Sequence, residues 1–287
     1  MVSGSLDKTI KIWDVESKNL VYTIQDEHTI YSLTKINGTL LASGSDELIK
    51  IWNLNDGSLM KTVSGHQFAV AFLKMFKNGD RLASASFDNS VKIWNVNDKF
   101  TLNITINESS ALSAFEIISD NLIATGSYSN QLNIWDVNTG KIVQQFYTGF
   151  TIETLNMLRD GYRLSIGDVV TGVHLYSIKN SKIIQTIQPG CWRLTQINDT
   201  SLAYVSIPQT KYALNVYNLK SNELKQINQS NSYNDLILID ESESLIGLVN
   251  QNKIEIWCLK NQTLITTLRG HNNLIISLGL VDNFPKL

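Results

Sequence analysis

The fold is decided by residues 43–53, Ser-Gly-Ser-Asp-Glu-Leu-Ile-Lys-Ile-Trp-Asn. Six related stretches occur elsewhere in the chain: two are close copies, one is a weaker copy and three are diluted. Each of the seven ends in an aromatic residue, and these are Trp13, Trp52, Trp94, Trp135, Tyr176, Tyr217 and Trp257. Successive anchors lie 39 to 42 residues apart. A period of this length indicates a repeat architecture.

The bulk composition narrows the classes of protein that fit the chain. With a net charge of −2 over 287 residues, the sequence lacks the basic footprint of nucleic-acid binders and the polybasic patch of membrane-surface proteins. Cys191 and Cys258 lie too far apart for a zinc site or a redox pair. No apolar run reaches membrane-spanning length, and the N-terminus lacks the basic-then-apolar layout of a secretory leader. We therefore expect no nucleic acid, membrane, metal or cofactor, and a cytoplasmic location with the nucleus as the alternative.

Each period contains four short apolar runs separated by polar or glycine-containing turns. The runs are rich in β-branched residues and too short for helices, so we expect strands. Turns such as Asn37-Gly38 suit hairpins, because Asn and Gly tolerate positive φ. In the second repeat the expected strands are Ile30–Ile36, Leu40–Gly44, Leu48–Trp52 and Ser58–Val63.

Four antiparallel strands make a small twisted sheet whose two faces are too apolar to remain in water. Packing such sheets face to face around an axis buries both faces and leaves only short, protected edges. With seven anchors, the sequence predicts an all-β, seven-bladed β-propeller of four-stranded antiparallel blades. Since the period is unbroken, we expect residues 1–287 to form a single domain.

The repeats resemble WD repeats over essentially the whole chain, strongly in the first four and weakly in the last three. Gly-His precedes a first strand at residues 65–66 and 270–271, and Ser-Gly-Ser or Ser-Ala-Ser lies in the second strand. The third strand ends in Ile-Trp-Asp or Ile-Trp-Asn. The resemblance implies a propeller whose most common role is to contact other proteins.

The two ends of the chain read as two parts of one repeat. The chain opens within a second strand at Val2-Ser3-Gly4-Ser5, and Leu274–Leu280 reads as a first strand with no second strand after it. Running residues 284–287 on into residues 1–3 restores a normal repeat. We therefore predict a first blade shared between about residues 1–26 and 270–287, in which a C-terminal strand joins three N-terminal strands. This arrangement closes the ring and covers edges that would otherwise promote aggregation.

His, Ser, Asp and Trp recur together with the repeat period. A hydrolase would need this constellation once, beside oxyanion donors, whereas here it recurs and includes an indole that can only donate a hydrogen bond. We interpret it as a structural tetrad that ties strands together, and the resemblance implies the same network. No catalytic residue is predicted, and the chain is expected not to be an enzyme. The three sets are His28, Ser43, Asp46 and Trp52; His66, Ser84, Asp88 and Trp94; and, across the termini, His271, Ser3, Asp7 and Trp13.

The later repeats depart from this pattern. The turn position of the aspartate holds Ser129 in the fourth repeat and then Val170, Lys211 and Gln251 in the following ones. His174 lies outside the motif, and we interpret it as an ordinary strand residue. The last three blades are therefore expected to rely on packing alone.

Function is expected where loops and tight turns gather on a rigid scaffold. The resemblance places contacts at the loops into first strands and the turns between second and third strands. Turn tips are normally polar, so aromatic and apolar residues there suggest a protein-binding patch. The candidate partner-binding residues are Leu6, Tyr31, Phe87, Tyr128, Phe150, Trp192 and Arg193.

Three functions fit these observations. The first is a non-catalytic interaction scaffold that binds a partner protein or peptide on one face, as a monomeric propeller inside a larger complex. The alternative is a substrate-recognition subunit of a ubiquitin ligase. Against it, phosphopeptide readers need clustered arginines, whereas the first-strand starts offer only Arg193, and no Trp-Asp-x-Arg sequence occurs. The third, a propeller enzyme, lacks any recognisable carboxylate or metal cluster.

Overall fold

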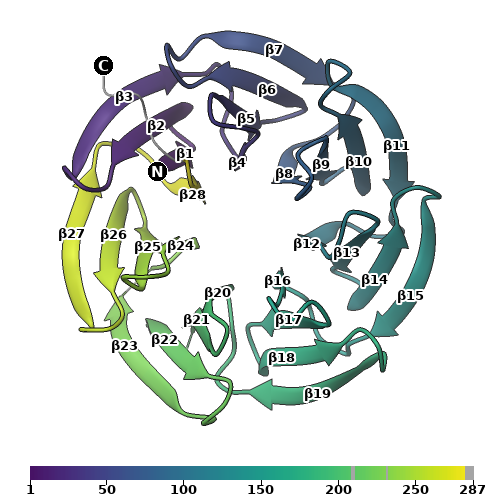
Figure 1. Cartoon of the computed structure of the whole chain (residues 1–287), viewed down its shortest axis with the longest axis vertical. Coiled ribbons are helices and arrows are strands. Elements are labelled where there is room, and N and C mark those ends of the chain that lie inside the picture. The colour runs from purple at the N-terminus through teal and green to yellow at the C-terminus, as the bar shows by residue number, and fades with distance from the viewer. Residues whose placement is uncertain (208–210, 231, 282–287) are drawn as a thin grey trace. The chain divides into compact units, whose positions relative to one another are not determined.

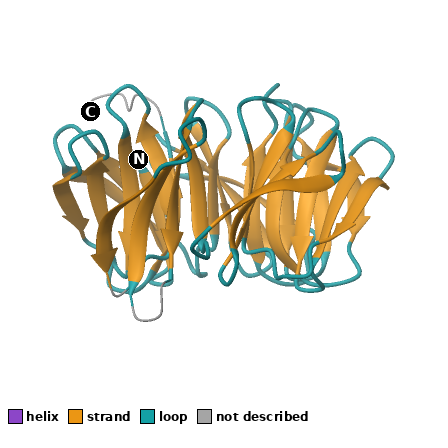
Figure 2. Ribbon diagram, turned by 90° about the horizontal axis from the view of Figure 1, so that it is seen from below, coloured by secondary structure: helices purple, strands orange, loops and turns teal. Residues whose placement is uncertain are grey.

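A computed structural model describes residues 1–207, 211–230 and 232–281. These residues form 28 strands in seven antiparallel sheets of four strands each (Figure 1). Strands and loops alone make up the described part (Figure 2), so it contains no helix that could cross a membrane. The seven sheets are the blades of a seven-bladed β-propeller, and the predicted fold class is confirmed.

Close contacts divide the chain into two compact units. The first contains residues 1–109 and 251–255 with the C-terminal part from Thr266, and the second contains residues 110–250 and 256–265. The expectation of a single domain remains a prediction.

The first compact unit contains three blades. Blade 1 has the strand order β28 (Ile275–Gly279), β1 (Val2–Ser5), β2 (Thr9–Asp14), β3 (Asn19–Gln25). Blade 2 consists of β4 (Ser32–Lys35), β5 (Leu40–Gly44), β6 (Leu48–Asn53) and β7 (Leu59–Ser64). Blade 3 consists of β8 (Val70–Met75), β9 (Arg81–Ser86), β10 (Ser90–Asn95) and β11 (Thr101–Asn107).

The second compact unit contains three further blades. Blade 4 consists of β12 (Leu112–Ile117), β13 (Leu122–Ser127), β14 (Gln131–Asp136) and β15 (Lys141–Tyr147). Blade 5 consists of β16 (Thr154–Met157), β17 (Arg163–Asp168), β18 (Gly172–Ser177) and β19 (Lys182–Ile187). Blade 6 consists of β20 (Arg193–Asn198), β21 (Ser201–Ser206), β22 (Tyr212–Asn218) and β23 (Leu224–Ser230).

The residues of blade 7 are divided between the two units. Its strands are β24 (Leu236–Asp240), β25 (Leu245–Asn250), β26 (Lys253–Cys258) and β27 (Thr263–Arg269).

The C-terminal strand β28 completes blade 1. It pairs antiparallel with β1, with Ser3 opposite Leu278 and Gly4 opposite Ser277. The predicted joining of one C-terminal strand to three N-terminal strands is therefore confirmed. Residues 282–287, which carry the Phe284–Leu287 part of the predicted junction, lie outside the described residues.

Apolar side chains from neighbouring blades form the core of the first unit. Ile10 and Ile12 of β2 are buried in one cluster with Ile30, Leu33 and Leu41 of blade 2. Alternation along a strand sends every second side chain to the same face, which is why Ile-Lys-Ile patterns fit this position.

The glycine of the Ser-Gly-Ser stretch allows a close approach between blades. A Cβ atom added to Gly4 would lie 2.4 Å from Cγ2 of Ile30, and one added to Gly44 would lie 2.5 Å from the Val70 carbonyl oxygen. Such distances are too short for any side chain, so only glycine lets the next blade's incoming chain pass here.

Candidate functional site

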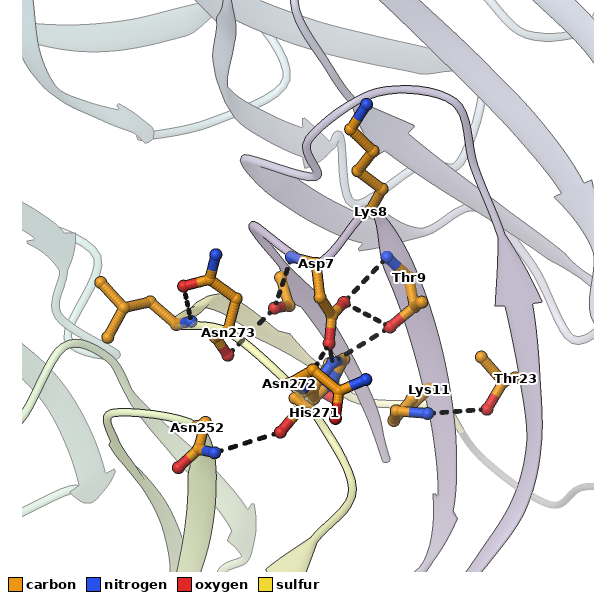
Figure 3. A network of polar contacts seen from close by, with 12 residues as sticks. Asp7, Lys8, Thr9, Lys11, Thr23, Asn252, His271, Asn272 and Asn273 are labelled. Carbon is orange, nitrogen blue, oxygen red and sulfur yellow. Dashed lines mark hydrogen bonds and ion pairs between the residues drawn. The ribbon is translucent and has the colours of Figure 1, made fainter.

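The tetrad of blade 1 links the two ends of the chain. Trp13 donates its indole N–H to Ser3 Oγ (2.8 Å), and Ser3 Oγ lies 2.7 Å from His271 Nε2. His271 Nδ1 lies 2.8 Å from Asp7 Oδ2, and Thr9 donates its hydroxyl to Asp7 Oδ1 at 2.6 Å (Figure 3). The structure thus brings together the four residues that the sequence analysis grouped, and they fasten β2, β1, the loop before β28 and the β1–β2 turn.

Blade 3 holds the same arrangement. His66 donates from Nδ1 to Asp88 Oδ2 (2.8 Å) and accepts at Nε2 from Ser84 Oγ (2.7 Å), while Trp94 donates to Ser84 Oγ (2.8 Å). A carboxylate only accepts and an indole only donates, so these bonds fix the tautomer of the imidazole. The His66 and Asp88 side chains are only 1% and 8% exposed and Ser84 is fully buried, so the Ser84 hydroxyl is not accessible from solvent.

Burial sets the protonation of both tetrads. It lowers the pKa of His66 and of His271, although the facing aspartate opposes the shift in each case. Burial would raise the pKa of Asp88, but hydrogen bonds from Ser90, from the Gln67 N–H and from His66 outweigh it, so this pKa lies below its ordinary value. Each tetrad therefore holds a neutral imidazole against an ionised carboxylate.

The predicted tetrad of blade 2 is incomplete. Trp52 donates to Ser43 Oγ at 2.8 Å, as predicted. His28, however, is 34% exposed, and its Nδ1 lies 3.5 Å from Asp26 Oδ1 and from Lys50 Nζ. Asp46 is exposed and lies beside the Tyr31 hydroxyl. The assignment of His28 and Asp46 to a tetrad is therefore wrong.

Two connections of blade 2, the loop into its first strand and the turn between its second and third strands, are each one residue shorter than in the blades that hold a tetrad. This explains why the blade 2 tetrad does not form. Ile30 N donates to Ser5 O and Val70 N donates to Ser45 O, so the two positions are equivalent. Ile30 lies six residues after Ile24, whereas Val70 lies seven residues after Val63. The following turn is also shorter, because Ser43 and Trp52 are nine residues apart while the Ser–Trp pairs of blades 1 and 3 are ten apart.

Asp26 takes the place of the tetrad histidine in blade 2. It precedes Ile30 by four residues, as His66 precedes Val70. Its side chain is fully buried and forms an ion pair with Lys50 Nζ at 2.5 Å, while Oδ1 also accepts the N–H groups of Glu27 and His28. Its other oxygen, Oδ2, has no hydrogen-bond partner among the described residues. Counting back four residues from the first-strand start would have identified this position.

Blade 5 has a polar network that the sequence analysis missed. His174 Nε2 lies 3.1 Å from Asp168 Oδ2, and Nδ1 lies 2.9 Å from Thr186 Oγ1. Burial would raise the pKa of Asp168, but hydrogen bonds from His174, Thr171 and two N–H groups lower it to about 2. The interpretation of His174 as an ordinary strand residue, and of blade 5 as held by packing alone, is wrong because the partner aspartate precedes the turn instead of lying within it.

All seven candidate partner-binding residues lie at one end of their blades. We call it the His–Asp end, and it carries the loop into the first strand and the turn between the second and third strands. Phe87 and Tyr128 are 45% and 56% exposed, while the other five are half-buried. The turns after second strands hold Leu6 (after β1), Phe87 (after β9) and Tyr128 (after β13). The loops into first strands hold Tyr31 (before β4) and Phe150 (before β16), and Trp192 and Arg193 lie at the start of β20.

Three of these candidates are engaged inside their own unit. The Phe150 ring stacks on His174, with centroids 4.1 Å apart and planes at 16°, so it covers the polar network of blade 5. The Arg193 guanidinium lies over the Trp192 ring at 4.8 Å. Burial raises the pKa of Glu153, and the nearby Arg193 charge opposes this rise.

Other apolar residues at the His–Asp end are more exposed than most of the predicted ones. In the first unit they are Phe68 (62%) and Leu274 (41%), and in the second unit Val170 (81%) and Ile207 (36%). Val170 and Ile207 both follow second strands; the repeat spacing had placed Val170 in its turn without counting it as a contact residue, and it had not singled out Ile207.

Comparison with known proteins identifies the repeats. The family model described as "WD domain, G-beta repeat" matches residues 1–14, 18–53 and 57–95, the first three repeats of the chain.

Three curated relatives show how far the similarity extends. The chain is 33% identical over 87 residues to the U3 small nucleolar RNA-associated protein 15 homolog of Gallus gallus, covering 30% of this chain and 17% of that protein. It is 31% identical over 78 residues to the F-box/WD repeat-containing protein sel-10 of Caenorhabditis elegans, covering 26% and 13%. It is 40% identical over 94 residues to the nuclear distribution protein nudF 1 of Talaromyces marneffei, covering 30% and 20%. The chain thus spans less than a quarter of the length of each of these relatives.

Proposed function

The chain is a WD-repeat protein, and we propose that it acts as a non-catalytic scaffold that binds a partner protein or peptide at the His–Asp end of its blades. The observation that carries the proposal is the exposure of large apolar residues at this end, including Phe68, Phe87, Tyr128 and Val170. In each of the two units, exposed apolar groups of this kind are typical of protein-binding sites.

The opposite end of the first unit provides the contrast. Its turns at 16–18, 37–39, 55–58, 77–79 and 97–99 expose polar residues and glycine, whereas Leu280, which follows β28, is 37% exposed. Since turns of polar residues and glycine form at one end of these blades, exposed apolar residues are not needed to form the turns at the other end. The difference between them therefore favours a role in binding for the His–Asp end.

The hydrogen bonds of the tetrad serines support the proposal that the protein is non-catalytic. Ser3 and Ser84 each accept an indole N–H and bond a buried imidazole, so their hydroxyls are used within the blade. A serine nucleophile needs access to a substrate carbonyl and to oxyanion donors. Arg193, on which a phosphopeptide-binding role would depend, stacks on Trp192 instead of standing in an arginine cluster.

Affinity capture from lysate tests the proposal. The tagged wild type is compared with the triple variant Phe87→Ala/Tyr128→Ala/Trp192→Ala. The matched control is Met60→Ala/Ile142→Ala/Tyr147→Ala, which truncates exposed residues on the outer strands β7 and β15. We expect the triple variant to lose at least one partner that the control retains, at equal melting temperature. If the triple variant keeps every partner, this end of the blades is not the binding surface.

We further propose that the chain works as a single copy within a larger complex, in the cytoplasm or the nucleus. The acidic balance of the sequence and its two isolated cysteines are consistent with this setting. Light scattering coupled to size exclusion tests the single copy, and imaging of a fluorescent fusion tests the location.

A further inference from the structure

One stretch of the His–Asp end in the first unit combines apolar and acidic side chains, and the inference from it rests on the proposed function. We call it the acidic strip and define it by Leu6, Tyr31, Asp46, Glu47, Phe68 and Phe87. It runs across blades 1, 2 and 3.

Backbone hydrogen bonds make the first half of the strip continuous. Leu6 N donates to Leu274 O at 2.9 Å, which holds the blade 1 turn against the loop before β28. Ile30 N donates to Ser5 O at 3.2 Å, so Leu6 and Tyr31 each follow directly after a residue of this bond.

The second half continues in the same way. Tyr31 N donates to Gly44 O at 2.9 Å, and Val70 N donates to Ser45 O at 2.9 Å. Phe87 N donates to Ala69 O at 3.1 Å, and Ser86 donates its hydroxyl to Phe68 O at 2.9 Å. The turn that carries Asp46 and Glu47 therefore lies between Tyr31 on one side and the Phe68–Phe87 pair on the other.

The strip carries uncompensated negative charge. Of the other acids at this end, Asp26 is neutralised by Lys50, whereas Asp7 and Asp88 are hydrogen-bonded to the neutral imidazoles of the tetrads and keep their charge. Asp46 and Glu47 are exposed and have no ion-pair partner among the described residues. The charge of Asp46 acts on its surroundings, since it adds to the effect of burial in raising the pKa of Tyr31.

Few bases oppose these acids. The three turns between second and third strands in this unit hold four acids and one base, Lys8. The loops into β4, β8 and β28 add Asp26 and Glu27 and contain no lysine or arginine. A partner with the same sign of charge would be repelled from this surface.

We propose that the acidic strip binds an extended segment of a partner protein in which a lysine or arginine is flanked by apolar residues. The cation pairs with Asp46 and Glu47 and lies against the Tyr31 ring, where the ring face attracts it. The flanking apolar side chains cover Phe68 and Phe87, which are 62% and 45% exposed. Complementary charge selects the segment and apolar burial supplies most of its affinity.

Fluorescence anisotropy with three designed peptides of equal length tests this proposal. The first alternates lysine with leucine, the second has glutamate in place of lysine, and the third has serine in place of leucine. We expect the lysine–leucine peptide to bind the full chain at least about tenfold more tightly than either of the others, and its affinity to fall with rising salt. Equal binding of the glutamate peptide would overturn the proposal.

Two double variants locate the binding. Asp46→Asn/Glu47→Gln is expected to weaken the lysine–leucine peptide about fivefold at low salt, and Phe68→Ala/Phe87→Ala about tenfold. The matched controls lie elsewhere in the same unit: Glu16→Gln/Asp56→Asn at the opposite end and Leu59→Ala/Met60→Ala on β7. Controls that weaken binding as much as the strip variants would show that the peptide binds elsewhere, and the proposal would fail.

The same variants separate this proposal from the proposed function. A partner captured from lysate that is lost with Phe87→Ala/Tyr128→Ala/Trp192→Ala but kept at full yield with Asp46→Asn/Glu47→Gln supports the scaffold role and refutes the acidic strip. A capture profile unchanged by the triple variant refutes the scaffold surface itself, whatever the peptides do.

Discussion

Blades 1 and 2 use almost the same sequence, yet they fasten their second and third strands with different chemistry. In blade 1, Trp13, Ser3, His271 and Asp7 form a hydrogen-bonded tetrad with a neutral imidazole. In blade 2, the tryptophan–serine bond remains, but a buried ion pair between Asp26 and Lys50 replaces the imidazole and its aspartate. The comparison teaches that connection length decides which side chains meet, since both connections around blade 2 are one residue shorter.

The largest expected effect comes from removing the strand that only blade 1 takes from the C-terminus. Deleting residues 271–287 removes His271 and β28, which leaves β1 with an open edge and Ser3 and Asp7 without their partner. We expect a sharp fall in the melting temperature, or aggregation through the exposed edge. Thermal unfolding and size exclusion measure this, and an unchanged melt would refute the closing role of β28.

The ion pair of blade 2 gives the next largest effect. Asp26→Ala leaves the Lys50 ammonium buried without a counter-charge, and such a change destabilises a protein by about 3 kcal/mol or more. The double variant Asp26→Ala/Lys50→Met removes both charges, so we expect it to recover most of the loss. Urea unfolding measures both variants. If the double variant is no more stable than the single one, the pair itself is not what stabilises blade 2.

The tetrad of blade 3 should be less sensitive, because its histidine is neutral. Asp88→Ala removes the acceptor for His66 Nδ1 and for the Gln67 N–H, and we expect a loss of about 1 to 3 kcal/mol. Asp46→Ala is the matched control, since Asp46 occupies the corresponding turn of blade 2 without belonging to a tetrad. Equal losses for the two variants in urea unfolding would mean that the tetrad contributes nothing of its own.

Sequence patterns were sufficient where the repeat spacing is constant. Seven aromatic anchors and four apolar runs per period predict seven four-stranded sheets, because a strand needs only its alternation and its turns to be recognised. The closing strand was predictable because Val2–Ser5 and Leu274–Leu280 are complementary parts of one repeat. The tetrads of blades 1 and 3 were predictable because His, Ser, Asp and Trp recur together with the repeat period.

The sequence analysis failed in blade 2, where two connections are each one residue shorter than in the neighbouring blades. His28 matched the motif by residue type, but the position four residues before Ile30, which corresponds to that of His66 before Val70, is occupied by Asp26. The sequence also could not predict which candidate side chains are exposed, because the exposure of a side chain depends on neighbours that are distant in the chain. Phe150 has the composition of a contact residue, yet it stacks on His174 across 24 residues of sequence.

The smallest predicted effect is the pH dependence of the melting temperature, which we expect to arise from the tetrad histidines of blades 1 and 3. The pKa values of His66 and His271 are lowered on folding, so the unfolded chain binds more protons at these sites once the pH falls below about 6.5. Their contribution to stability is complete at neutral pH and declines as the pH drops toward the lowered pKa values. We expect the melting temperature to fall between pH 7 and pH 5, and to fall less steeply in His66→Gln/His271→Gln. This difference in slope is expected from blades 1 and 3, which hold the complete tetrads. A slope that is the same in the wild type and the double variant would place the pH dependence outside the tetrads.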